Sequence, residues 1–294
     1  MRRLRLTGTV RITGPDFWGR QSTLVIEPIV DQTDYRWLWR WKYGHDVSVT
    51  PKLFRVGGFL GRCVVLVHRV DGKTYRFHEA EHIIGWLHAL GVRGVCIWLE
   101  DSDWPPYMCQ AQLRREIKNL LIPQLPLKPY QPQRSILSTE NGKPRTVSYA
   151  PDHLRGLIVK ANVNYSDERV GHHALEFWGG VDEDNLMKVL SARTLGKPQL
   201  LWPLAWVASK WAGWKGQSKK IVWGPGLLGQ PTPSICQELA EHKVVDAGLY
   251  SFAAPWDSFL AGTINGYRNN HELDIRQIRE LSPHDNVLEL RKSA

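Results

Sequence analysis

Apolar residues follow two periods along the chain, and together they predict a protein that mixes α-helices with β-strands. Short apolar and β-branched runs predict strands at 22–27, 62–68, 94–100, 157–164 and 218–223. Apolar residues at helical spacing predict helices at 81–90, 110–121, 237–252 and 258–266. Tryptophans alternate at positions 37, 39 and 41, as they do on one face of a strand. The order of these elements is that of an α+β fold.

The strongest break in composition is a proline-rich segment near the middle of the chain, with prolines at 123, 126, 129 and 132. Proline fixes φ and lacks an N–H donor, so this density cannot continue a helix or a central strand. We therefore expect residues 123–145 to link two domains, an N-terminal α+β domain of residues 1–122 and a C-terminal one of residues 146–294. Each half offers several strands and about two helices, which predicts two similar domains, each a sheet layered with helices.

Composition narrows the class of protein. The 294 residues are 43% apolar and 23% charged, which is typical of a globular protein, and no apolar run approaches the ~18 residues of a membrane span. The basic start, Met1–Arg5, is not followed by the apolar region of a signal peptide, so we expect a cytoplasmic protein. The four cysteines form no C-x-x-C pair, which argues against a cysteine zinc site or a disulfide framework.

The formal net charge of +9 comes from 38 Lys and Arg against 29 Asp and Glu. Such a balance is compatible with nucleic acid, an anionic lipid surface or a phosphorylated substrate as partner. No nucleic-acid-binding motif accompanies it, so we expect no nucleic-acid partner, and proximity to a membrane surface stays open.

The segment from His78 to His82 is the first that suggests catalysis, and it has two interpretations. Its letters satisfy H-E-x-x-H, which on one helix would place His78 and His82 on the same face to bind zinc, with Glu79 as base. Alternatively, only Glu81 and His82 act: the histidine binds the metal, and the carboxylate at the helix start activates a water molecule. The first interpretation needs an extra helical turn before Glu81, where the sequence resembles the end of a strand.

A second segment supplies further metal ligands. His242 and Asp246 are four residues apart in a helical context, so they point the same way from successive turns. With His82 they would form a His₂Asp set that leaves a fourth tetrahedral position open, as in catalytic zinc sites.

These residues belong to a longer pattern of four segments, which are Glu81–Leu87, Ser191–Gly196, His242–Asp246 and Gly266–Leu273. The set resembles the UDP-3-O-acyl-N-acetylglucosamine deacetylases, zinc amidohydrolases of lipid A biosynthesis. In that family the corresponding segments read V-E-H-L-x-A-A-L-x-G-L, A-R-T-F-G, R-H-K-x-L-D and Y-K-S-G-H. The resemblance runs from about Gly14 to Leu281, and it rests on four motifs in register.

The resemblance implies two α+β domains with the active site between them, and zinc bound by His82, His242 and Asp246. It further implies a small N-acyl substrate, an acylated nucleotide sugar in the family, whose amide is attacked by a water molecule bound to zinc. We expect the protein to act as a monomer.

The resemblance also implies four catalytic roles. Glu81 would be the general base, and Thr194 would donate a hydrogen bond to the oxyanion of the tetrahedral intermediate. Lys243 would add positive charge at the same place, and His271 would protonate the leaving amine. This set is chemically coherent, because the charge that develops on the oxyanion meets a donor and a cation.

The chain departs from the family at positions that recognise the substrate. Ala150 stands where the family has a lysine that contacts substrate phosphate, and the family's histidine-containing loop near the N-terminus is replaced by Pro15–Arg20. Tyr250 stands where the family has the aspartate that orients the acid histidine. The D-G-S sequence becomes Cys109–Ala111, and the phenylalanine of R-T-F-G becomes Leu195.

The leading hypothesis is therefore a zinc-dependent deacetylase of this type, with the lipid A precursor as substrate. A family member that acts on a different N-acyl compound is the first alternative, since the phosphate and loop contacts are altered. The H-E-x-x-H peptidase is the second. A non-catalytic homologue that binds polyanions is the third, from a different class of function.

Overall fold

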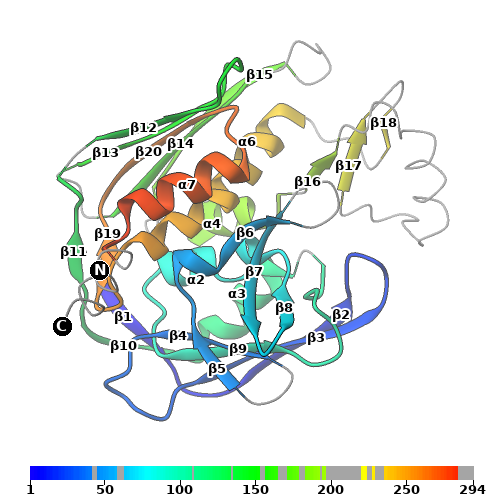
Figure 1. Ribbon diagram of the computed structural model, residues 1–294, viewed down its shortest axis with the longest axis vertical. Helices are drawn as coiled ribbons and strands as arrows, with labels where there is room; N and C mark the ends of the chain where they lie inside the picture. Colours follow the sequence, from blue (N-terminus) through cyan, green and yellow to red (C-terminus); the bar gives the residue numbers. More distant parts are fainter. Residues whose placement is uncertain are drawn as a thin grey trace.

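The computed structural model describes residues 1–41, 45–57, 63–107, 109–133, 135–152, 156–164, 171–178, 183–192, 194–196, 220–223, 227–228 and 235–283; for residues 183, 194–196, 220–223, 227–228, 235 and 236 it describes the backbone alone. Figure 1 shows two sheets on opposite sides of the molecule with helices from both halves of the chain between them. The expected α+β class with two sheet-and-helix domains is confirmed.

The N-terminal half contains a five-stranded sheet. In spatial order its strands are β2 (Val10–Pro15), β3 (Gln21–Pro28), β9 (Val95–Leu99), β4 (Trp37–Trp41) and β5 (His45–Ser48). Strand β9 is the last of them in the chain, yet it lies in the middle, antiparallel to β3 and parallel to β4. Its Val95, Cys96 and Ile97 are buried, as expected for a central strand that is covered on both faces.

The C-terminal half repeats this topology. Its sheet has the spatial order β12 (Ile136–Thr139), β13 (Thr146–Ala150), β20 (Gly262–Tyr267), β14 (Leu157–Asn164) and β15 (His172–Trp178). Again the last strand lies in the middle, with β20 antiparallel to β13 and parallel to β14. The two halves thus have the same strand order and directions, although no repeat is visible in the sequence.

Each half also inserts a three-stranded sheet before its central strand. In the N-terminal half this sheet consists of β6 (Phe54–Gly57), β7 (Cys63–Val70) and β8 (Lys73–Phe77) after the 3-10 helix η1 (Pro51–Leu53). In the C-terminal half it consists of β16 (Thr194–Gly196), β17 (Lys220–Trp223) and β18 (Leu227–Leu228), which follow α4 (Glu183–Leu190). A helical segment follows each inserted sheet, and these segments carry five of the seven candidate functional residues, Glu81 and His82 on one and His242, Lys243 and Asp246 on the other.

The helical segments form the inner layers of the molecule (Figure 1). The N-terminal half contributes α1 (Ala80–Ile83), α2 (Gly85–Ala89) and α3 (Gln110–Lys118). The C-terminal half contributes α6 (Ile235–Ala247), the 3-10 helix η3 (Gly248–Ala253) and α7 (His271–Leu281), besides α4. Helix α6 packs on β14 and β15 and also contacts α1 and α2 of the other half. The two halves therefore meet helix against helix.

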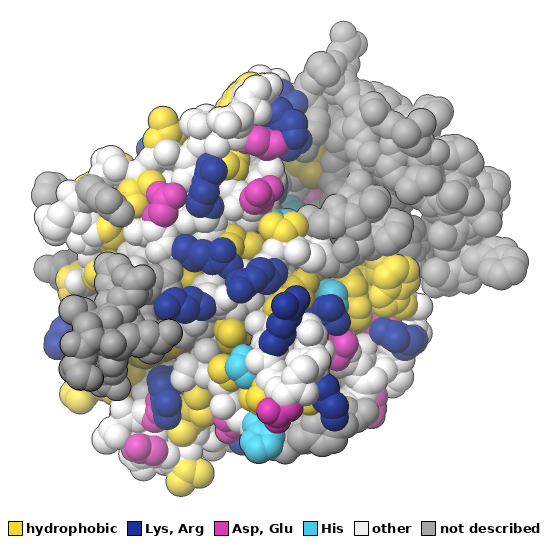
Figure 2. All heavy atoms as spheres, viewed as in Figure 1, with side chains coloured by type: hydrophobic (Ala, Val, Ile, Leu, Met, Phe, Trp, Pro, Cys, Tyr) yellow, Lys and Arg dark blue, Asp and Glu magenta, His cyan; other side chains and the backbone are white. Residues whose placement is uncertain are grey.

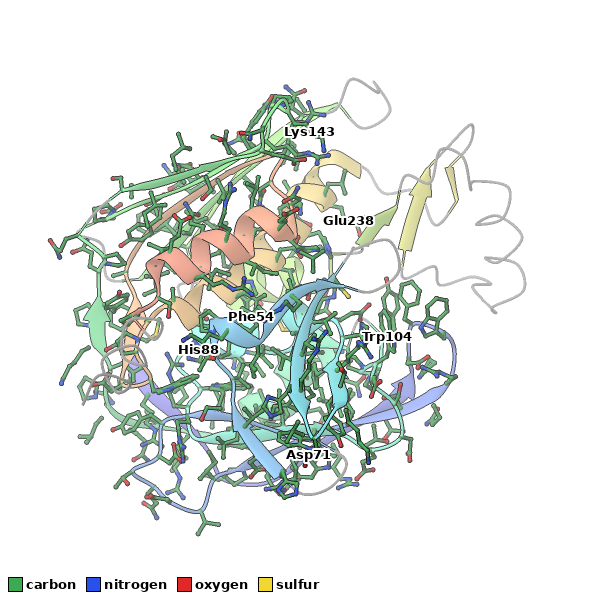
Figure 3. All side chains as sticks on the ribbon, in the orientation of Figure 1. Phe54, Asp71, His88, Trp104, Lys143 and Glu238 are labelled. Carbon is green, nitrogen blue, oxygen red and sulfur yellow. The ribbon has the colours of Figure 1, made fainter. Side chains whose placement is uncertain are left out.

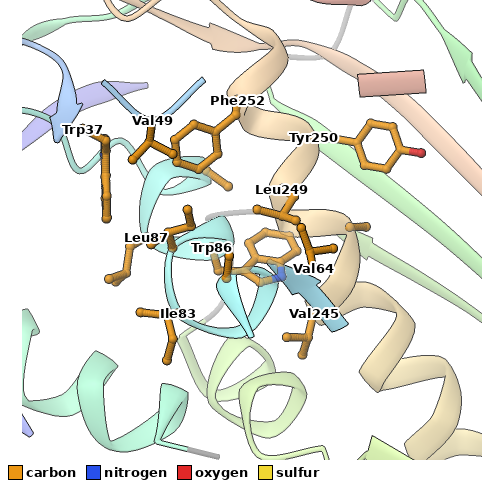
Figure 4. Close-up of a cluster of buried hydrophobic side chains, with 14 of the residues drawn as sticks. Trp37, Val49, Val64, Ile83, Trp86, Leu87, Val245, Leu249, Tyr250 and Phe252 are labelled. Atoms are coloured by element: carbon orange, nitrogen blue, oxygen red, sulfur yellow. The ribbon is translucent and has the colours of Figure 1, made fainter. Parts of the chain in front are cut away.

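A continuous apolar core fills this junction. Figure 4 shows Trp86 of α2 among Val64, Val245 and Leu249, which come from three separate elements. The Trp86 indole also donates a 2.8 Å hydrogen bond from Nε1 to the carbonyl oxygen of Val244. An indole that buries its ring and satisfies its N–H across the junction fixes both the spacing and the orientation of the two halves.

The segment expected as a linker contains ordered strands. Strand β10 (Leu121–Pro126) pairs with β1 (Arg2–Leu6), and β11 (Lys128–Tyr130) pairs with β19 (Ser258–Leu260). Strands β10 and β11 each pair with only one strand in their sheets. A proline is tolerated in such a strand, because no second neighbouring strand needs the N–H donor that proline lacks. Since β12 is the edge strand of the C-terminal sheet, that sheet begins at Ile136, inside the expected linker range of 123–145.

The predicted helix at 258–266 is wrong, because these residues form β19 and most of β20. Small and apolar residues fill this segment, and burial on both faces of a central strand produces a continuous apolar run that periodicity cannot distinguish from a buried helix. The helix predicted at 237–252 is present, with its last turn continuing as η3.

Candidate functional site

Glu81 and His82 stand at the start of α1, directly after the inserted sheet of the N-terminal half. Strand β8 ends at Phe77, and Glu79 adopts the left-handed conformation at φ 54°, which turns the chain from strand into helix. The turn leaves the Glu81 and His82 side chains almost fully buried, at 1% and 6% exposure. Two adjacent ionisable groups at this depth need compensation from partners or from a bound ion.

His78 lies outside the helix, so the geometric requirement of the H-E-x-x-H interpretation is not met. Its ring stacks on Trp104, with centroids 4.0 Å apart, and its Nδ1 atom is 4.0 Å from Cys63 Sγ. Burial and the nearby Arg76 lower its pKa to about 4, so the ring is neutral near pH 7. The chain turns before Ala80, and His78 therefore cannot share a helical face with His82.

His242 and Asp246 lie one turn apart on α6 and are also buried, at 7% and 3% exposure. The structure brings them to His82, so the ligand atoms of the three residues all lie within 4.8 Å of one another. Asp246 Oδ1 is 3.6 Å from His242 Nε2 and 3.9 Å from His82 Nε2. The two halves of the chain therefore meet at a His₂Asp cluster.

The spacing and donor types of this cluster fit zinc. Bonds of about 2.0–2.2 Å in a tetrahedral site place neighbouring donor atoms about 3.4 Å apart, close to the two distances above. Asp246 Oδ1 is buried and accepts no hydrogen bond from the residues that the structure describes. Two imidazoles and one carboxylate are also the donor set of an open, catalytic zinc site.

The charges within the cluster perturb one another. Burial would raise the pKa of Asp246, but Lys243 and the imidazoles of His242, His271 and His82 outweigh it and hold that pKa below its ordinary range. Burial lowers the pKa of His242, with Asp246 opposing the shift. Asp246 is thus an anion, and burial favours the neutral form of the His242 imidazole beside it; these are the protonation states that metal ligands require.

Glu81 is held beside His82, His242 and Asp246. Its Oε2 atom accepts a 2.9 Å hydrogen bond from the backbone N–H of Val64, and its Oε1 atom is 3.8 Å from His82 Nε2. Oε1 is buried and accepts no hydrogen bond from the described residues. Burial and the negative charge of Asp246 raise the pKa of Glu81 well above its ordinary value. One carboxylate oxygen is anchored, and the other faces the cluster.

Two further predicted residues border the cluster. His271 is the first residue of α7, and its ligand atom lies within 4.8 Å of those of Glu81 and Asp246. Lys243 Nζ donates a 2.9 Å hydrogen bond to Asp246 Oδ2. The side chain of Thr194 lies outside the described residues, although its backbone begins β16. Six of the seven predicted residues are thus together, and the structure does not place the seventh side chain.

The position where the family has its orienting aspartate belongs to a buried network here. The Tyr250 hydroxyl donates a 3.0 Å hydrogen bond to Asp274 Oδ1, and Asn269 Nδ2 donates to both oxygens of the same carboxylate. Asp274 is one turn beyond His271 on α7. The carboxylate of this network therefore comes from α7 and not from position 250. Figure 4 shows the Tyr250 hydroxyl pointing away from the apolar core.

The sequence reasoning missed several contacts of this site. Neither the Val64 N–H that anchors Glu81 nor Asp274 belongs to a motif, because a backbone donor and a buried carboxylate on a neighbouring helix leave no local pattern. Strand β13 contains Ala150, which stands where the deacetylases have a lysine that contacts phosphate, and the preceding Tyr149. The Tyr149 hydroxyl donates a hydrogen bond to the backbone oxygen of Ala261.

No family model matches the chain, and no curated protein matches it. None of the helices in the described part of the chain combines the length and the apolarity needed to cross a lipid bilayer.

Proposed function

We propose that the protein is a zinc-dependent amidohydrolase that removes an N-acyl group from a small substrate. The observation that carries this proposal is the buried cluster of His82, His242 and Asp246, with Glu81 Oε1 facing it. The resemblance to UDP-3-O-acyl-N-acetylglucosamine deacetylases supports the same assignment from the motifs.

Glu81 is the general base in this proposal. Zinc bound by the cluster would lower the pKa of a water molecule towards about 7 and polarise the amide carbonyl. Glu81 Oε1 takes the proton from the attacking water, while Oε2 stays anchored on the Val64 N–H.

His271 and Lys243 complete the reaction from the other half of the chain. His271 donates a proton to the leaving nitrogen, so that the C–N bond breaks to give a neutral amine and a carboxylate. Lys243 places its ammonium group beside Asp246, where it stabilises negative charge on the oxyanion. We assign the oxyanion hydrogen bond to Thr194 from its motif alone.

The substrate remains a choice between two N-acyl classes. The family's acylated nucleotide sugar is the default, and it would make the protein a lipid A pathway enzyme of the cytoplasm, acting as a monomer. Ala150 lacks the charge that would contact the nucleotide's phosphate, which favours a different N-acyl compound. Figure 2 shows Lys and Arg side chains in a band across the middle of one face of the molecule.

The test is an assay of the purified protein, loaded with zinc, on UDP-3-O-acyl-N-acetylglucosamine and on a panel of simple N-acyl amino sugars and N-acyl amino acids. We expect release of the free amine, loss of activity with a chelator, and recovery when zinc is returned. Hydrolysis of the panel but not of the nucleotide sugar would select the second substrate class. If the zinc-loaded protein hydrolyses none of these amides, the assignment as an amidohydrolase is wrong.

A further inference from the structure

The N-terminal half contains a cavity that the proposed reaction does not use. Its volume is about 800 Å³, within the range of small-ligand sites, and it lies between β4, β8 and the segment 99–104 that follows β9. Two of its walls are strands, so their side chains are held before any ligand arrives, which reduces the entropy cost of binding.

Aromatic rings line the cavity on two sides. On one side Trp39, Trp41 and Tyr75 pack together, with ring centroids of Trp41 and Tyr75 5.5 Å apart. On the other side Trp18 and Trp104 meet edge to face, with centroids 6.0 Å apart. Trp18 stands at the rim with 51% exposure, whereas Trp104 is 8% exposed. Figure 3 shows Trp104 beside the hairpin formed by β2 and β3.

Several charged side chains that line the cavity form ion pairs with groups of opposite charge. Arg40 forms ion pairs with Glu27 at 2.7 Å and with Asp46 at 2.9 Å, and Arg20 pairs with Asp16 at 2.9 Å. Among the carboxylates of the lining, Glu100 forms an ion pair with Arg11. The remaining charged residues of the lining are two cations and two carboxylates, Lys73, Arg76, Asp101 and Asp103. Guanidinium and carboxylate groups fixed in this way offer oriented donors and acceptors without an excess of either charge.

We propose that this cavity binds a neutral carbohydrate of a few sugar rings. The faces of the aromatic rings pack against the apolar C–H faces of pyranose rings, and the paired guanidinium and carboxylate groups hydrogen-bond to the hydroxyls. A nucleotide would use the same aromatic faces, but Arg20 and Arg40, two of the four cations in the lining, are already paired with carboxylates, and a phosphate calls for cations that are not.

The cavity is separate from the His₂Asp cluster, and the proposal does not rest on the amidohydrolase activity. Trp104 lines the cavity and stacks on His78, which precedes Glu81 by three residues in the chain. Carbohydrate binding should therefore persist when the chemistry at Glu81 is removed.

The experiment measures binding of cellotetraose, xylotetraose, maltotetraose and tetra-N-acetylchitotetraose to the full-length protein by calorimetry and by saturation-transfer NMR. Each is used at up to about 10 mM, ten times the ~1 mM dissociation constant of a weak binder. We expect saturable binding of at least one of them, and at least a tenfold loss of affinity in Trp18→Ala and in Trp41→Ala. Trp18 is half exposed, so its replacement leaves the fold intact even if Trp41→Ala does not.

Two controls define the site. Trp178→Ala removes a tryptophan of similar exposure, 45%, from the C-terminal sheet and should leave the affinity unchanged. Glu81→Gln should bind carbohydrate like the unaltered protein, which separates this proposal from the proposed hydrolysis. The proposal is overturned if none of the four oligosaccharides binds, if Trp18→Ala binds as well as the unaltered protein, or if ADP binds instead with an affinity that Arg76→Ala abolishes.

Discussion

The backbones of Gly85 of α2 and Gly248 of η3 are in direct contact where the two halves of the chain meet. A Cβ atom on Gly85 would come within 2.8 Å of the Leu249 backbone nitrogen, and one on Gly248 within 2.8 Å of the Trp86 backbone nitrogen. Gly85 is three residues after His82, and Gly248 is two after Asp246. This contact between backbones therefore sets how closely the two parts of the His₂Asp cluster approach.

Gly85→Ala should destabilise the protein and weaken zinc binding together. The added methyl group meets backbone atoms that cannot move aside, and such overpacking costs roughly 1–3 kcal/mol, more than the ~1 kcal/mol that alanine gains over glycine in a helix. Urea denaturation and a zinc competition assay measure the two effects. Gly8→Ala is the matched control, because its Cβ would meet only the Leu120 side chain at 3.9 Å. Equal stability of the two variants would contradict the role given to this contact.

The Asp274 carboxyl predicts how stability depends on pH in the metal-free protein. Burial raises its pKa from 3.8 to about 6, despite attraction to Lys243 and the hydrogen bond from Asn269. Because the folded state holds its proton more tightly than the unfolded state, stability should fall as pH rises from about 4 to about 6. Asp274→Asn removes the free-energy cost of burying a charged carboxylate, so this variant should be more stable than the unaltered protein by up to roughly 3 kcal/mol at pH 8.

Denaturation by urea at pH 4 and pH 8 tests this prediction. The advantage of Asp274→Asn should vanish at pH 4, where the unaltered side chain is protonated in both states. Asp257→Asn, whose side chain is 51% exposed, serves as the control and should show no advantage at either pH. An Asp274→Asn variant that is less stable at pH 8 would show that the charged carboxylate is worth more to the network than its burial costs.

Glu81→Gln should separate metal binding from catalysis. The amide oxygen can still accept the hydrogen bond from the Val64 N–H, so the helix start keeps its geometry and His82, His242 and Asp246 stay in place. Without a carboxylate to take the proton, hydrolysis should fall by about 10²–10⁴-fold. Zinc content should remain that of the unaltered protein. Retained activity in this variant would rule out Glu81 as the base.

The sequence was informative wherever local pattern decided the outcome. The strands at 22–27 and 157–164 follow from the apolar pattern, and the helical prediction at 81–90 corresponds to the two short helices α1 and α2. The i, i+4 spacing placed His242 and Asp246 on one face. The Glu81-His82 pair supplied the third expected ligand, which the motif resemblance also implies, and the structure does bring the three side chains together. Whether they bind zinc stays a prediction.

The parts that could not be predicted depend on contacts distant in sequence. Strand β20 resembles a buried helix in composition, because only its neighbours β13 and β14 reveal it as a central strand. The pairing of β1 with β10 makes a strand of a proline-containing segment that looked like a linker. The shared topology of the two sheets, and the Gly85–Gly248 contact between the halves, also leave no periodic signal in a single sequence.

The central claim is that His82, His242 and Asp246 bind one zinc ion, and the most direct test is the zinc content of the purified protein and its variants. We predict one zinc ion per chain in the unaltered protein and in His78→Ala, and less than a tenth of that in His82→Ala and in His242→Ala, with all variants checked for folding by circular dichroism. If His242→Ala keeps its zinc while His78→Ala loses it, the metal lies elsewhere and the proposed site is wrong.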